Sequence, residues 1–355
     1  MLDKLSFYGI RGLSFTWFSN YLSNRKQRVT YNRTNSDIRD IVCGVPQGSI
    51  LGPLLFLLYI NDLSTVSKEF FTIMYADDTN LFLQGSDISE VESTFNTEIS
   101  KVTDWIKANK LSLNVKKTHS MIFSCTSSVR NKIVNVSFDN VCVDTVSCTR
   151  FLGVLLDNRL SWDQQIQHVC NKISKCTGVM KKASRVLLRD TLLQLYYIFV
   201  YPYDVYCNII WGSAAKTNLS KIFILQKKII RIMHNLGVRE HTQSFFRERG
   251  ILNIFDLYNY NVCMFMFRYH HCQLPNIFDG IFETQDSVHH YVFRSATRQL
   301  YVTKYCRTNL RQNTFIHNGP RLWNALVITH DLDTCLSKNV FKCKLKNILM
   351  NNLHT

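Results

Sequence analysis

Residues 70–83 read FFTIMYADDTNLFL, two apolar runs interrupted by the adjacent carboxylates Asp77 and Asp78. Such runs on either side of an Asp pair predict a β-hairpin with the carboxylates at or near its turn, where Asp tolerates unusual dihedrals. Two charges inside an apolar segment are costly unless something neutralises them. A divalent metal is the usual remedy, because Mg²⁺ takes oxygen ligands from one or two carboxylates plus substrate phosphates. The stretch therefore indicates phosphoryl-transfer chemistry.

The composition is that of a basic, folded protein. The chain has 355 residues, enough for roughly two or three domains, and its 46% hydrophobic content excludes a disordered chain. Lys and Arg outnumber Asp and Glu by 42 to 26, and the formal net charge of +16 favours nucleic acid as a partner over a membrane surface. On charge alone, an ordinary basic protein without such a partner stays an open alternative.

Cysteine usage and hydropathy indicate the cellular compartment in which the protein is expected. The 12 cysteines include no C-x-x-C pair, so neither a zinc ribbon nor a redox motif is indicated. The N-terminus lacks the apolar core of a signal peptide, and no apolar run reaches the roughly 18 residues of a membrane span. We therefore expect free thiols in a reducing, intracellular compartment and no secretion.

The elements before the carboxylate pair are predicted from periodicity. Residues 13–22 have helical spacing, and residues 27–32 alternate as a strand with a basic outer face. Residues 44–49 are a loop, and Pro53 suits a first helical turn. Residues 54–63 are apolar nearly all round, which predicts a buried helix.

After the pair, a capping box at 89–92 opens an amphipathic helix that ends near Asn109. Strands are predicted at 111–115, 119–124 and 151–156, the last as a strand or hairpin arm. A second capping box, at 161–164, opens the first of several helices; the others cover 187–200 and 219–235. A boundary near residue 160 thus separates a mixed α/β domain from a helical one.

The motifs stand in an order that one family shares: GVPQGSILGPLLF at 44–56, YADD at 75–78, NKLSLN at 109–114, KT at 117–118 and FLG at 151–153. In this order and spacing they resemble the reverse transcriptase of non-LTR, LINE-type retrotransposons of a jockey-like lineage. The segment from Trp17 to Val29 and NGPRLWN at 318–324 extend the resemblance over most of the chain, least securely from 240 to 290.

The resemblance implies an α+β fold, a partial right-hand polymerase palm of antiparallel sheet and helices followed by a helical thumb and a mixed C-terminal region. The implied domains are the palm at 1–160, the thumb-like domain at 161–240 and the basic C-terminal region at 241–355. The implied activity is RNA-directed DNA polymerisation, with an RNA template, a DNA primer and dNTPs as partners and no membrane. By analogy it takes place in cytoplasmic ribonucleoprotein and the nucleus.

The resemblance also implies residue roles. Asp77 and Asp78 would ligate a catalytic pair of Mg²⁺ ions, Asp78 more weakly, and Lys117 would protonate or neutralise the departing pyrophosphate. The implied template and substrate contacts are Pro46, Gln47, Gly48 and Tyr75, with Phe151, Leu152 and Gly153 as the primer grip. The implied phosphate-tracking cations of the thumb are Lys221, Lys227, Lys228 and Arg231.

One part of the family pattern is expected to be missing. Members carry a further metal-binding Asp on a strand well before the PQG motif, whereas this chain begins in the helix after that strand, and Asp3 falls on the helix. The two-ion site is therefore expected to be incomplete. An alternative of another class is a catalytically dead nucleic-acid-binding remnant of such an element, and a third is an unstable product without activity.

Several residues have simpler interpretations. Asp62 is expected to be a helix-end residue and Lys117 could be a solvated lysine, while the thumb cations could form only a solvated helix face. Four residues near 270 fit no common zinc finger and are expected in core and surface positions; they are Cys263, His270, His271 and Cys272. Trp323 is expected to pack in the core.

Overall fold

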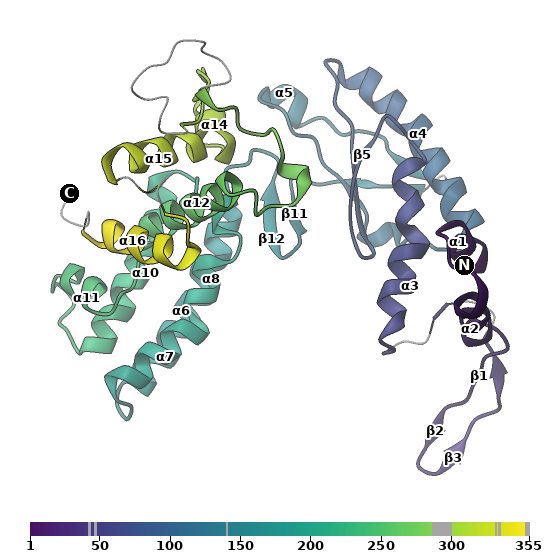
Figure 1. Cartoon of the computed structure of the whole chain (residues 1–355), viewed down its shortest axis with the longest axis horizontal. Helices are drawn as coiled ribbons and strands as arrows, with labels where there is room; N and C mark the ends of the chain where they lie inside the picture. Colours follow the sequence, from purple (N-terminus) through teal and green to yellow (C-terminus); the bar gives the residue numbers. More distant parts are fainter. Residues whose placement is uncertain are drawn as a thin grey trace. The chain divides into compact units, whose positions relative to one another are not determined.

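The computed structural model describes residues 1–41, 44–45, 48–139, 141–285, 300–330, 332 and 335–351. The chain forms two compact units, Met1–Val146 and Ser147–Thr355 (Figure 1). This boundary lies ahead of residue 160, because the hairpin at 148–157 packs with the helices that follow it. Residues on both sides of 240, such as Ile229 and Phe267, share one core.

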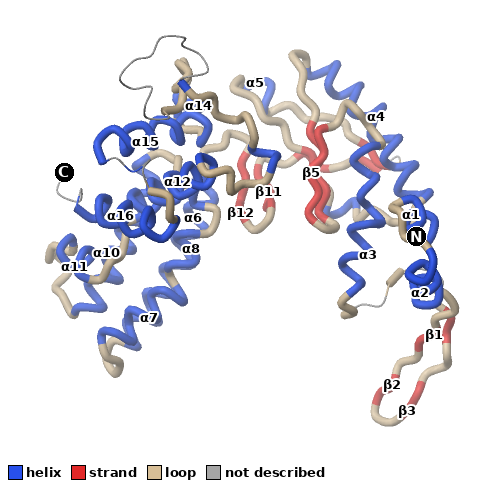
Figure 2. The backbone as a smooth tube through the Cα atoms, viewed as in Figure 1, coloured by secondary structure: helices blue, strands red, loops and turns tan. Residues whose placement is uncertain are grey.

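Unit 1 combines helices with two-stranded sheets (Figure 2). Its helices are α1 (Leu2–Phe7), α2 (Gly12–Leu22), α3 (Leu51–Ile60), α4 (Ile88–Ala108) and α5 (Ser127–Arg130), with 3-10 turns η1 (Asn61–Thr65) and η2 (Val115–Lys117). Its antiparallel pairs are β1 (Lys26–Gln27) with β4 (Arg39–Asp40), β2 (Thr30–Tyr31) with β3 (Thr34–Asn35), β5 (Phe71–Tyr75) with β6 (Asp78–Phe82), and β8 (Ser137–Phe138) with β9 (Val141–Cys142). One pair, β7 (His119–Ser120) with β10 (Asp144–Thr145), is parallel.

The amphipathic helix α4 organises the core of unit 1. Its N-cap is Asp87, two residues before the predicted capping box, and the Asp87 carboxylate accepts a hydrogen bond from the Glu90 backbone N–H at 3.2 Å. Its inner face carries Ile99, 2% exposed, in the cluster that contains Phe70. The helix therefore provides the apolar surface on which the hairpin β5–β6 rests.

The side-chain ammonium of Lys4 joins three segments of unit 1. Lys4 Nζ forms a 2.7 Å ion pair with Asp62 Oδ1, donates to the Tyr59 carbonyl at 2.6 Å, and lies 4.7 Å from the Trp105 ring centroid. The Trp105 indole N–H donates to the other Asp62 oxygen at 3.3 Å. Asp62 is thus a structural residue in η1, just after the end of α3, as expected, and not a spare metal ligand.

Replacing Lys4 should make the backbone amides of α4 easier to open to hydrogen exchange. We expect Lys4→Met to lower the opening free energy of the α4 amides by about 1–2 kcal/mol, because the Asp62 carboxylate loses charge-assisted hydrogen bonds while the aliphatic stem is kept. Hydrogen exchange followed by mass spectrometry measures this change. The exposed Lys68→Met is the matched control and should leave exchange unaltered; equal protection in both variants would contradict the role of Lys4.

Several sequence predictions in unit 1 are wrong, and the strand predicted at 119–124 is confirmed only at His119–Ser120. Helix α3 is not buried all round, because the described residues of the unit cover only the side that carries Leu55; Leu54 and Leu57 are 52% and 49% exposed. Residues 111–115 form no strand. Lys110, at φ +53°, ends α4, and the chain then runs irregularly into η2 without a pairing partner among the described residues.

Unit 2 is a hairpin followed by helices. The hairpin pairs β11 (Cys148–Phe151) antiparallel with β12 (Val154–Asp157). The helices are α6 (Asp163–Ala183), α7 (Arg189–Phe199), α8 (Tyr201–Val205), α9 (Asn208–Trp211), α10 (Lys216–His234), α11 (Gln243–Glu248), α12 (Ile254–His270), α14 (Asn309–Gln312), α15 (Phe315–His330) and α16 (Lys338–Asn351), with the 3-10 turn η3 (Asn276–Phe278). Helices α6 and α10 pack along each other, and α12 lies against α15 and α16.

The start of α6 depends on Asp157, which no capping pattern in the sequence indicates. The predicted capping box at 161–164 does not form, and Trp162, at φ +64°, stands at the N-cap without a capping side chain. Instead the buried Asp157 carboxylate accepts backbone N–H groups from Arg159 at 3.0 Å, Ser161 at 3.1 Å and Trp162 at 2.8 Å. Asp157 therefore fixes the turn between the hairpin and the first long helix.

The Cys and His residues near position 270, which could suggest a zinc site, lie in the aromatic core or at its edge. Burial raises the pKa of the Cys263 thiol to about 12, which opposes the thiolate that zinc needs. His270 Nδ1 forms a hydrogen bond with the Tyr301 hydroxyl at 3.2 Å. Trp323 is 1% exposed and stacks on Phe341, so its predicted packing role is confirmed.

At a coarse level the protein is helix-rich with small, mostly antiparallel sheets, which agrees with the predicted α+β class. Within the described ranges, none of the helices combines the length and apolar character that crossing a membrane requires.

Candidate active site

The predicted carboxylate hairpin is present. Strands β5 and β6 pair from Phe71↔Phe82 to Tyr75↔Asp78, and the two-residue turn Ala76-Asp77 joins them. Ala76 has φ +52°, in the left-handed region that such tight turns use. Asp77 thus lies in the turn and Asp78 begins the returning strand, as the sequence suggested.

One face of this hairpin is anchored and the other is open. Met74 and Leu81 pack against the core of unit 1. At the base of β5, the Ser67 hydroxyl donates to the buried Glu98 carboxylate of α4 at 2.7 Å. The opposite face carries Tyr75, 65% exposed. The packed face therefore leaves the turn carboxylates exposed to solvent.

The two carboxylates are suitable, though few, ligands for a divalent cation. Asp77 and Asp78 are both exposed and adjacent, and their oxygens are the donors that Mg²⁺ accepts together with water and phosphate oxygens. Among the described residues, no group of three or more His, Cys, Asp or Glu side chains could hold a metal ion. The donor set fits one ion completed by substrate and water, and it does not by itself make a two-ion site.

The PQG loop is described only in part. Pro46 and Gln47 lie outside the described residues. Gly48 has φ +80°, and a Cβ added there would meet no heavy atom within 4 Å, so open space borders its backbone. The Ser49 hydroxyl next to it accepts the Gly52 N–H at 3.0 Å and starts α3.

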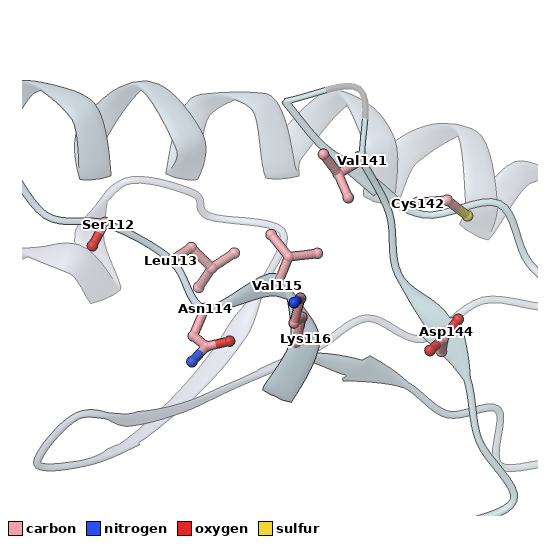
Figure 3. Close-up of a pocket in the computed structure, with 8 residues that line it drawn as sticks. All are labelled: Ser112, Leu113, Asn114, Val115, Lys116, Val141, Cys142 and Asp144. Carbon is pink, nitrogen blue, oxygen red and sulfur yellow. The ribbon is translucent and has the colours of Figure 1, made fainter.

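Lys117 is an exposed residue of η2, and its placement near the carboxylates stays a prediction. A hollow of about 580 Å³ borders this turn (Figure 3). Its lining includes Lys116 and, across the hollow, Asp144, but neither Asp77 nor Asp78. The hollow is therefore separate from the hairpin tip.

The FLG segment forms the turn of the hairpin β11–β12. Leu152 and Gly153 have φ +44° and +85°, so both turn residues are left-handed. The Tyr206 hydroxyl, at the end of α8, donates to the Leu152 carbonyl, and a Cβ on Gly153 would lie 3.4 Å from its ring. Tyr206 thus holds the candidate primer grip on the helices of unit 2. Sequence reasoning missed it because no local pattern marks a contact across 54 positions.

Helix α10 has one apolar and one basic face. Ile222, Ile229 and Ile230 are fully buried against the core. The predicted cations Lys221, Lys227, Lys228 and Arg231 lie on the outer arc of the helix, which follows from its 3.6-residue period. Lys221 Nζ donates to Asn218 Oδ1 at 3.0 Å, and Arg231 Nε donates to the Glu240 carbonyl at 3.1 Å. Lys227 Nζ lies 4.1 Å from the Phe223 ring centroid, so three of the four are partly held in place.

The structure brings together part of the predicted site. Tyr75, Asp77 and Asp78 share one hairpin tip, and Gly48 and Lys117 come from other segments of the same unit. The FLG turn and the α10 cations belong to unit 2.

Comparison with known proteins gives a family match for unit 1 and the first hairpin of unit 2. Residues 2–156 match the family described as reverse transcriptase (RNA-dependent DNA polymerase). These residues are similar to the reverse transcriptase family. The match contains the carboxylate hairpin, the PQG loop, Lys117 and the FLG turn.

The curated relatives agree with a jockey-like non-LTR reverse transcriptase. The chain is 24% identical to a probable RNA-directed DNA polymerase from transposon X-element of Drosophila melanogaster, over 69% of this chain and 27% of the relative. It is 27% identical to the RNA-directed DNA polymerase from mobile element jockey of Drosophila funebris, over 61% and 24% respectively. It is 28% identical to a probable RNA-directed DNA polymerase from transposon BS of Drosophila melanogaster, over 59% and 24%. The chain spans about a quarter of the length of these relatives.

Proposed function

We propose that the chain contributes the carboxylate hairpin and the primer-holding unit of an RNA-directed DNA polymerase of a jockey-like non-LTR retrotransposon. The observation that carries this proposal is the two-residue turn of β5–β6, which presents Asp77 and Asp78 to solvent inside the segment that matches the reverse transcriptase family. Unit 1 would act as part of the palm, and the helices of unit 2 as the thumb and C-terminal region.

The reaction is transfer of a nucleotidyl group. The 3′ hydroxyl oxygen of a DNA primer attacks the α-phosphorus of a dNTP, the new O–P bond forms as the bond to the β-phosphate oxygen breaks, and pyrophosphate leaves while the hydroxyl proton is lost to solvent. Bound Mg²⁺ supplies charge neutralisation of the phosphate oxygens, and Asp77 and Asp78 are the residues that would hold it. Lys117 would place an ammonium beside the leaving pyrophosphate.

Other residues would position the substrates. The open backbone of Gly48, together with Pro46 and Gln47, would border the template and the incoming nucleotide, because a glycine lets a ligand approach closely. Tyr75, exposed beside Asp78, would contact the substrate at the hairpin tip. Phe151, Leu152 and Gly153 would contact the primer from the turn that Tyr206 holds.

The cationic face of α10 would hold the template–primer duplex through its phosphates. Lys227→Gln/Lys228→Gln should lower the affinity for an RNA–DNA hybrid and reduce the slope of log K against log salt by about 1.8, since two phosphate contacts are lost. Fluorescence anisotropy over a salt series measures both quantities. Lys172→Gln/Lys175→Gln on α6 is the charge-matched control; an unchanged slope in the α10 variant would contradict the role of its cations.

Primer extension tests the function. The folded protein should incorporate labelled dTMP on poly(rA)/oligo(dT) when Mg²⁺ is present, and EDTA should stop the incorporation, because the phosphate charge is then left without a counter-ion. Duplex binding without any incorporation would instead support the nucleic-acid-binding remnant and overturn the polymerase proposal for this chain.

A further inference from the structure

Unit 1 carries a two-stranded ribbon that is not buried, so packing does not account for it. Strands β1 and β4 pair at its base and β2 and β3 at its tip, and every residue from Lys26 to Asp40 is exposed. Figure 2 shows it as a long hairpin beyond α2. The sequence had predicted a strand with one basic face, and such a strand normally buries the other face. An isolated two-stranded hairpin is at best marginally stable in water, so this one is suited to binding a partner.

The chemistry of the ribbon fits a polyanion. Residues 25–40 contain five Lys or Arg and only two Asp. Lys26 pairs with Asp40 at 3.7 Å and Arg25 donates to the Gly44 carbonyl at 2.6 Å. Within the described residues, the remaining cations make no ion pair or side-chain hydrogen bond; they are Arg28, Arg33 and Arg39. Tyr31 adds a ring that is 75% exposed.

The tip carries a second, independent signal. Asn32 and Arg33 form a two-residue turn with φ +46° and +64°, closed by the pair Tyr31↔Thr34. Such turns favour Asn-Gly, because glycine adopts positive φ without strain. An arginine at the glycine position costs roughly 1–2 kcal/mol. A strained, unpaired cation at the end of an exposed hairpin is unfavourable for folding, and this strain is the second observation that favours a role in binding.

We propose that the ribbon β1–β4 binds duplex DNA by entering its major groove, with Arg33 at the tip and Arg28 and Arg39 along its sides as phosphate contacts. The major groove of B-form DNA admits a two-stranded β-ribbon, whereas the major groove of A-form RNA is too narrow for side chains to read. Binding requires neither dNTPs nor the carboxylates Asp77 and Asp78, so it stands or falls separately from the polymerase proposal.

Binding of the full chain to a labelled duplex of about 20 base pairs, followed by anisotropy at several salt concentrations, tests the ribbon. Arg28→Gln/Arg39→Gln should weaken DNA binding about tenfold or more and lower the salt slope by about 1.8. Lys68→Gln/Lys132→Gln, which removes two exposed cations elsewhere in unit 1, should change neither quantity comparably. Equal losses in the two variants would overturn the proposal.

Arg33→Gly separates binding from folding. Because glycine relieves the turn strain, this variant should melt no lower than wild type, yet its salt slope for DNA should fall by about 0.9. An RNA duplex of the same sequence is the second probe, and its affinity should be lower and insensitive to the ribbon variants. Unchanged DNA binding by Arg33→Gly, or an equal effect of the ribbon variants on both duplexes, would contradict groove binding of DNA.

Discussion

Asp77→Asn is expected to reduce dTMP incorporation on poly(rA)/oligo(dT) by about 1,000-fold, or roughly 4 kcal/mol of transition-state stabilisation. The amide keeps the shape of the side chain but loses the negative charge that would hold Mg²⁺ at the turn. Asp77 is exposed and makes no packing contact in the core clusters, so the unfolding free energy should change by no more than about 0.5 kcal/mol.

Two further variants test whether the loss of incorporation is specific to the carboxylate at the turn. Asp78→Asn should cost about 10- to 100-fold, because the neighbouring carboxylate is the weaker ligand in the family pattern. Asp104→Asn removes an equally exposed carboxylate from α4 and should retain incorporation. Wild-type rates in Asp77→Asn would show that any incorporation observed comes from elsewhere, and a comparable loss in Asp104→Asn would show a general charge effect.

A second expected result concerns the core of unit 2, where Asp204 is completely buried. Burial raises the pKa of its carboxyl to about 7, against hydrogen bonds from Gln226 Nε2 at 2.9 Å and Tyr196 OH at 3.5 Å that lower it. The second carboxylate oxygen has no partner among the described residues. The folded protein therefore retains a proton that the unfolded chain releases near pH 4.

The unfolding free energy should fall as the pH rises. The folded pKa lies above the unfolded value, so the contribution of Asp204 to stability is fully present below about pH 4 and is lost as pH rises toward 7. Between pH 5 and pH 8 the unfolding free energy should fall by about 2.5 kcal/mol on this account. Asp204→Asn, which keeps an oxygen acceptor and cannot ionise, should remove that fall.

Urea unfolding at the two pH values measures the difference, with the buried Trp211 and Trp323 as fluorescent reporters of unit 2. His234, whose pKa is lowered by burial and then by Arg249, has the opposite pH dependence. Its contribution cancels when wild type and Asp204→Asn are compared. The same pH dependence in both proteins would show that the Asp204 carboxyl does not retain its proton.

Local patterns explain why parts of the fold could be predicted from the sequence. The hairpin at Asp77, the helix ending near Asn109 and the inner face of α10 all follow from periodicity or turn chemistry within a few residues. Burial of α3 could not be predicted in the same way. An apolar helix is buried only where other segments cover it, and no local pattern shows whether they do.

Contacts between residues far apart in the sequence could not be predicted for a related reason. Lys4 and Asp62 are separated by 58 positions, and Gln226 reaches Asp204 across 22. Only the tertiary fold brings such pairs together. The exposed ribbon was also beyond prediction, because alternation indicates a half-buried strand and both of its faces are open.

Single-nucleotide incorporation opposite a defined base of an RNA template tests the polymerase proposal most directly. Four reactions, each with one labelled dNTP, a DNA primer and Mg²⁺, should extend the primer only with the complementary nucleotide. Each of the four template bases should select its own partner. Absence of incorporation by the folded protein, or addition that ignores the template base, would contradict an RNA-directed DNA polymerase.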